Sequence, residues 1–211
     1  MDRTSISLSN PGRIQLRKED GTVVYGADQE WYGSRMKKMA GCGPTVGSTQ
    51  LLYLHAKGRV RLPVEVLDQK SFVSLMDLVW RHVTPSFKGV STLSHYCGGM
   101  HSFLKKEIGT DVPCHTLDVP RTKSKRPKLD ELATFLAEGL GRDCPVAFLI
   151  LTSGTVEHLE AWHWVTIVSM DFDPAVGTLT AEIYNARESH RIDLRQWLET
   201  PGHGGGFVYF E

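Results

Sequence analysis

The sequence lacks an excess of charge of either sign and lacks any long hydrophobic run. Its 24 basic and 24 acidic residues give a formal net charge of +0, which argues against a general attraction to nucleic acid or to an anionic membrane. The longest apolar run, VAFLIL at 146–151, is far too short to span a bilayer. We therefore expect neither nucleic acid nor a membrane as a partner, and we expect the function to reside in a site.

The first ten residues, MDRTSISLSN, lack the basic and then apolar pattern of a secretory signal peptide. This predicts a cytoplasmic protein, although a mature secreted form without its leader would look the same. The cysteines, at positions 42, 97, 114 and 144, lack any C-x-x-C pair, and a chain of 211 residues needs no disulfide framework. We therefore expect reduced thiols.

Motifs for metals and cofactors are also missing. Five residues of zinc-ligand type lie in one region, but their spacing matches no standard zinc pattern: His95, Cys97, His101, Cys114 and His115. The HGGG at 203–206 resembles a lipase oxyanion loop, yet the G-x-S-x-G elbow that accompanies this loop is absent. The basic run 121–128 is typical of a solvated loop. We expect no metal and no organic cofactor.

The sequence does contain a helix-rich part followed by a strand-rich third. Apolar residues recur three and four positions apart in four segments, which predicts helices over 42–58, 71–83, 94–109 and 128–140. After residue 145, short segments rich in β-branched and aromatic residues predict an antiparallel sheet. This order indicates an α+β fold in which a helical lobe packs on a C-terminal sheet. Residues 1–28 are expected to form an N-terminal arm or a hairpin around Asp20 and Gly21.

The segment AGCGPTVGS at 40–48 combines a reactive residue type with glycines on both sides of it. Pro44 suits the first turn of a helix, so Cys42 should lie at a helix N-terminus, where the unpaired N–H groups favour a thiolate. Gly41 and Gly43 would let the backbone approach a substrate carbonyl. The alternative is a small, buried and inert cysteine in a tight turn.

His163, on the predicted strand WHWVTIV at 162–168, is the candidate base for this thiol. If the loop of the following hairpin is DFDPAVG at 171–177, paired residues have numbers that sum to roughly 348, and His163 faces Asn185. An Asn oxygen can accept the Nδ1 proton and leave Nε2 for the thiol. Asp173 competes, but ten extended residues span about 30 Å. A strand-end amide without a catalytic role is the alternative for Asn185.

These residues, in this order, resemble the papain-like cysteine peptidase superfamily, and most nearly the bacterial bacteriocin-leader peptidase-like domains: GCGPT opening a helix, HWV on a strand and an Asn on the next strand. The resemblance covers roughly 29–211 and implies one papain-like catalytic domain whose central helix is headed by the nucleophile. It implies Cys42 as nucleophile, His163 as base, Asn185 as orienting residue and Gln29 as a donor to the oxyanion. Gln29 stands thirteen positions before Cys42, farther than is usual in the superfamily.

The resemblance implies a thiol-dependent hydrolase, either a peptidase or an amidase, that acts on a peptide or amide-containing substrate through a thioester. Two alternatives stay open at this point. An amine could capture the thioester, which would make the protein an acyltransferase or a transglutaminase-like enzyme. The fold could also be retained in a non-catalytic binding module. Trp162 or Trp164 could shield the bond between His163 and Asn185, or pack as ordinary core residues.

Overall fold

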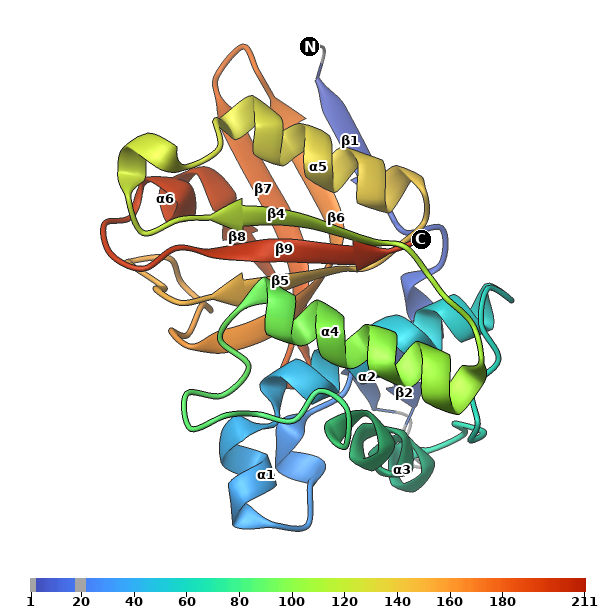
Figure 1. Ribbon diagram of the computed structural model, residues 1–211. Coiled ribbons are helices and arrows are strands. Elements are labelled where there is room, and N and C mark those ends of the chain that lie inside the picture. The colour runs from blue at the N-terminus through green and yellow to red at the C-terminus, as the bar shows by residue number, and fades with distance from the viewer. Residues whose placement is uncertain (1–2, 18–21) are drawn as a thin grey trace.

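An antiparallel sheet organises the computed structural model, which describes residues 3–17 and 22–211 (Figure 1). Seven strands of the described residues form it: β1 (Thr4–Ser7), β4 (Cys114–Val119), β5 (Val146–Ile150), β6 (His163–Asp173), β7 (Thr178–Asn185), β8 (Glu188–Asp193) and β9 (Gly205–Phe210). Their order is β4-β9-β5-β6-β7-β8, and β1 also pairs with β6. With several helices packed around this sheet, the structure is consistent with the expected α+β class.

The N-terminal segment contributes to two sheets. Strands β2 (Gln15–Arg17) and β3 (Val23–Tyr25) pair with each other as an antiparallel hairpin, while the predicted Asp20–Gly21 turn between them lies outside the described residues. Strand β1 pairs with the C-terminal half of β6. Strand β5 pairs with the N-terminal half of β6 along the same side of that strand. The sequence interpretation of an arm or hairpin missed this strand, because its partner is more than 160 residues away.

The four predicted helices are present, with ends that differ by a few residues. The structure contains α1 (Arg35–Ala40), α2 (Cys42–Ala56), α3 (Gln69–Trp80), α4 (Leu93–Phe103), α5 (Leu129–Gly141) and α6 (Leu194–Glu199). A single π turn, Leu104–Ile108, continues α4. Helices α1 and α6 were not predicted, because each has only six residues. None of the described helices is long and apolar enough to cross a membrane.

Helix α2 lies at the centre of the fold. Every residue from Gly43 to Leu54 is buried, because α3 covers one side of the helix and strands β5 and β6 cover another. Figure 1 shows helices α1 to α4 together in the lower half of the view, with α5 and α6 in the upper half. The N-terminal residue of α2, Cys42, is only partly buried. The N-terminal end of this otherwise buried helix therefore reaches the surface at a cysteine.

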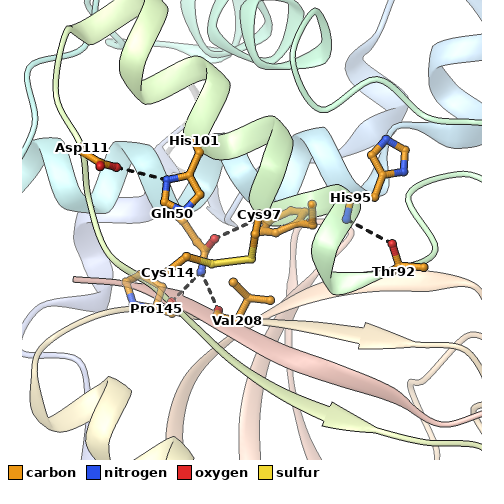
Figure 2. Close-up of a disulfide and its surroundings, with 10 residues drawn as sticks. Gln50, Thr92, His95, Cys97, His101, Asp111, Cys114, Pro145 and Val208 are labelled. Carbon is orange, nitrogen blue, oxygen red and sulfur yellow. Dashed lines mark hydrogen bonds and ion pairs between the residues drawn. A yellow bond between two sulfur atoms is a disulfide. The ribbon is translucent and has the colours of Figure 1, made fainter.

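Gln50 is a buried polar residue in the middle of α2. Its Nε2 donates to the carbonyl oxygens of Pro145 (2.8 Å) and Val208 (3.0 Å), and its Oε1 accepts from the Tyr96 hydroxyl at 2.8 Å. Figure 2 shows this amide between α4 and the sheet. Its three bonds satisfy the amide and join α2 to β9, to the start of β5 and to α4.

Cys97 on α4 and Cys114 on β4 form a disulfide (Figure 2). The expectation of reduced thiols is therefore wrong for this pair, whereas Cys42 and Cys144 are free. After α4 the chain turns back along β4, which brings the two Cα atoms to 6.6 Å although 17 positions separate them in the sequence. That separation lies within the range of disulfides, and no sequence spacing indicates it.

Candidate active site

Cys42 is the first residue of α2, immediately after the N-cap residue Gly41. A Cβ on Gly41 would clash with the Lys37 carbonyl oxygen, and a Cβ on Gly43 would lie 2.9 Å from the Val90 side chain. Both residues must therefore be glycine for the surrounding protein to pack against the head of the helix. The sequence interpretation assigned this space to a substrate carbonyl, but these neighbours fill it.

His163, the first residue of β6, lies between the side chains of Cys42 and Asn185. Its Nε2 is 2.8 Å from Asn185 Oδ1, and the Cys42 thiol is within hydrogen-bonding reach of the same ring. Because Nε2 is engaged by the amide oxygen, Nδ1 is the ring nitrogen that remains for the thiol. The sequence interpretation predicted that these three residues lie together, as they do, but it reversed the two ring nitrogens.

The register of the β6–β7 hairpin differs from the predicted one. Asp173 pairs with Thr178, and after a bulge near Ile167 the ladder ends with Thr166 opposite Tyr184. Asn185 is therefore displaced along β7 from the position directly opposite His163, and its side chain reaches the ring diagonally. The competing carboxylate, Asp173, lies at the far end of β6, where its Oδ1 accepts from the Ala175 N–H.

The electrostatic surroundings of His163 favour its charged form. Burial by itself would lower the pKa of the imidazole, but the hydrogen bond and the charge of Cys42 act in the opposite direction. The bond to Asn185 and the negative charge of Glu160 add to this effect, so the pKa of His163 is raised above its ordinary value. The protonated form of the His163 ring is thus favoured more than in an ordinary histidine.

Gln29 begins a short 3-10 turn, Gln29–Trp31, which is capped by the carboxylate of Asp28. Together with Cys42, His163 and Asn185 it lines one cavity of about 210 Å³. The buried Gln29 Oε1 has no hydrogen-bond partner among the described residues. The structure therefore brings all four sequence-predicted site residues to the same cavity, on the side of Cys42 that faces Asn185.

A second hollow, of about 520 Å³, lies against another side of Cys42; we call it the apolar groove. Its lining includes exposed apolar side chains, with Met39 74% exposed, Phe87 fully exposed and Trp162 50% exposed. Leu149 also lines it. Sequence reasoning missed the groove, because its walls come from distant segments that share no pattern.

The two tryptophans next to His163 differ in their surroundings. Trp164 is a core residue that stacks on Tyr96 with ring centroids 4.3 Å apart and donates its indole N–H to the Val90 carbonyl. Trp162 lines the apolar groove, 5.7 Å from the ring of His203. The HGGG segment thus supplies a groove residue, and the glycines that follow His203 lead into strand β9.

The residues of zinc-ligand type have other partners. His95 contacts the Thr84 carbonyl, His101 contacts Asp111 and His115 contacts Glu211. In the part of the chain that the structure describes, no three or more His, Cys, Asp or Glu residues are placed to hold a metal ion. In the basic run 121–128, Arg126 donates to four backbone carbonyls, so this residue anchors loops.

The arrangement joins a thiol, an imidazole and two carboxamides where a polar cavity meets an apolar groove. A comparison with known protein families finds no family model that matches the chain, and a comparison with curated proteins finds no match. The chemistry of the site is therefore argued from its residues. A histidine that is held by an amide and lies beside a thiol can take the thiol proton, and the resulting thiolate can attack a carbonyl group.

Proposed function

We propose that the protein is a papain-like cysteine hydrolase, a peptidase or an amidase, with Cys42 as its nucleophile. The observation that carries the proposal is the placement of His163 between Cys42 and the 2.8 Å bond to Asn185. A nucleophile, a base and a residue that orients the base are the three parts that thiol catalysis requires. The order of these residues along the chain is also that of the papain-like superfamily.

In this proposal, His163 takes the proton of Cys42 and the thiolate attacks the substrate carbonyl carbon. The carbonyl oxygen becomes an oxyanion, which the backbone N–H of Cys42 and the side-chain N–H of Gln29 stabilise. The carbon–nitrogen bond then breaks, the leaving amine takes the proton from His163 and a thioester remains. Water, deprotonated by His163, attacks the thioester, releases the acid and restores the thiol.

The apolar groove supports a substrate that carries a large apolar group near the reacting carbonyl. Met39 and Phe87 expose apolar surface beside the thiol, and burying such surface favours binding. A peptide with a bulky apolar side chain supplies this surface together with the amide bond that the mechanism breaks. A library of fluorogenic peptides that vary this side chain is therefore the first substrate screen.

The proposal is tested by the rate at which iodoacetamide alkylates Cys42, followed by mass spectrometry across pH. We expect Cys42 to react at pH values where glutathione, an ordinary thiol, is largely unreactive, and we expect His163→Ala to remove the difference. Trp197→Phe, a core substitution on α6, serves as the matched control. A Cys42 with the pH dependence of glutathione in the wild-type protein would overturn the enzyme proposal and favour a binding module.

Hydrolysis and acyl transfer are separated with a substrate found in the screen. Adding increasing concentrations of a primary amine to the reaction shows whether the product is the free acid or the new amide. Hydrolase activity predicts the acid as the main product at millimolar amine. An amide that dominates under these conditions would instead support the acyltransferase alternative.

A further inference from the structure

The turn that follows Asn185 is strained. Strand β7 ends at Asn185, β8 begins at Glu188 and these two residues pair, which leaves a two-residue loop. Both loop residues have positive φ, 47° at Ala186 and 77° at Arg187. This is the φ pattern of a type I′ turn, which normally contains Asn-Gly, because side-chain-bearing residues other than Asn and Asp disfavour this region. The sequence of this turn does not by itself favour its conformation.

Contacts with the segment before Gln29 hold this turn. Arg187 Nε donates to Asp28 Oδ2 at 2.8 Å, and the Arg187 carbonyl accepts from the Tyr25 N–H at 3.0 Å. Asp28 is only 4% exposed, and its Oδ1 accepts from the Glu30 N–H at 2.9 Å. One buried carboxylate therefore fixes both the strained turn and the 3-10 turn that contains Gln29. A strained conformation persists only where such surroundings determine it.

The geometry points to Asp28 and Arg187 as positioning residues for the active site, which hold Asn185 toward His163 and Gln29 toward Cys42. This inference rests on the proposed function. Asp28 directly precedes Gln29 in the chain, and Arg187 follows Asn185 by two residues, so the ion pair joins the two segments that carry these carboxamides. Asp28, Gln29 and Asn185 also line the same cavity as Cys42.

The first test compares Asp28→Asn and Arg187→Gln with the wild-type protein in the alkylation assay. Without the ion pair the Asn185 amide loses its fixed position, so the rate at Cys42 should fall about 10- to 100-fold near neutral pH. The pH profile should also shift toward that of glutathione. Arg187→Lys, which keeps the charge, should restore part of the rate. Arg191→Gln removes the exposed pair of Arg191, on β8 just after the turn, with Asp171 and is expected to change neither quantity.

A second test separates positioning from general destabilisation. The triple variant Asp28→Asn/Ala186→Asn/Arg187→Gly lacks the ion pair but has the Asn-Gly sequence that favours the turn. We expect it to recover the alkylation rate to within about threefold of wild type, because Asn185 is again held in position. The rate at Cys144, a buried thiol, is followed in the same samples and reports unfolding in each variant.

The outcomes distinguish the two proposals. If wild-type Cys42 is reactive but Asp28→Asn and Arg187→Gln keep its rate and pH profile, the positioning role is overturned and the proposed function stands. If Asp28→Asn does not fold, the triple variant decides: a folded triple variant with slow alkylation overturns the role. If wild-type Cys42 reacts like glutathione, the proposed function fails and the positioning role fails with it.

Discussion

The two sides of Cys42 differ in both chemistry and construction. The cavity that contains Asn185 and Gln29 is polar, and hydrogen bonds and one ion pair fix its side chains. The groove that contains Phe87 and Trp162 is apolar, and loop side chains that remain exposed form much of it. Under the proposed function, this difference assigns the chemical step to the polar side and substrate binding to the apolar side.

The largest expected effect comes from the thiol that both sides share. Cys42→Ala should reduce turnover of a peptide substrate by about 10⁴- to 10⁶-fold, because no other group replaces the sulfur as nucleophile. Steady-state kinetics measures this loss, and Cys144→Ala, at the other free cysteine, should retain activity. A Cys42→Ala protein with more than a few per cent of wild-type turnover would show that the chemistry lies elsewhere.

On the polar side, Gln29→Ala should lower kcat by about 100- to 1,000-fold and leave KM nearly unchanged. The side-chain N–H is assigned to the oxyanion, which exists only in the transition state and the intermediate. Gln196→Ala on α6 removes an exposed amide and serves as the control. An effect confined to KM would mean that Gln29 contributes to substrate binding. The assignment of the chemical step to the polar side and of binding to the apolar side would then fail.

On the apolar side, Phe87→Ser should raise KM by about tenfold for peptides with a bulky apolar side chain. Peptides with alanine in its place should be affected less, and alkylation by the small reagent iodoacetamide should not change. Met36→Ser is the matched control, because Met36 is also an exposed apolar residue of this region but does not line the groove. Equal losses in both variants would mean that general surface hydrophobicity governs binding.

The smallest expected effect is a shift in the titration of His163. The raised pKa of this residue depends in part on Cys42, so Cys42→Ala should lower the pKa toward the value that burial alone would produce. An NMR pH titration of the ring measures this, with the other histidines as internal references. The corresponding stabilisation is complete below the pKa of an unfolded histidine and is lost as pH rises through the raised value. An unchanged titration would mean that the thiol and the ring do not interact.

Local patterns predicted the elements that carry the candidate site, because helix and strand periodicity and short motifs are properties of adjacent residues. The helix headed by Cys42 and the strand that begins at His163 are at the predicted positions. Asn185 came from hairpin arithmetic that centred the turn too early in the chain, because the strands run on to Asp173 and Thr178, which pair with each other. The error was small enough for the Asn185 side chain to reach the ring diagonally.

Features that depend on distant segments could not be predicted. The disulfide between Cys97 and Cys114 requires α4 and β4 to be neighbours, and the apolar groove requires loops from separate parts of the chain. The ion pair of Asp28 with Arg187 joins residues more than 150 positions apart. An aspartate before a short turn and an arginine in a hairpin carry no local signal of this contact.

The buried amide of Gln50 determines the axial position of α2. One residue of travel along a helix corresponds to a shift of about 1.5 Å and a rotation of about 100°, and either change would break the bonds of Gln50 to Pro145, Val208 and Tyr96. Cys42 lies about 12 Å from Gln50 along the same rigid helix. The sulfur can therefore be aligned with His163 by a hydrogen-bonded reference point deep in the core, well away from substrate and solvent.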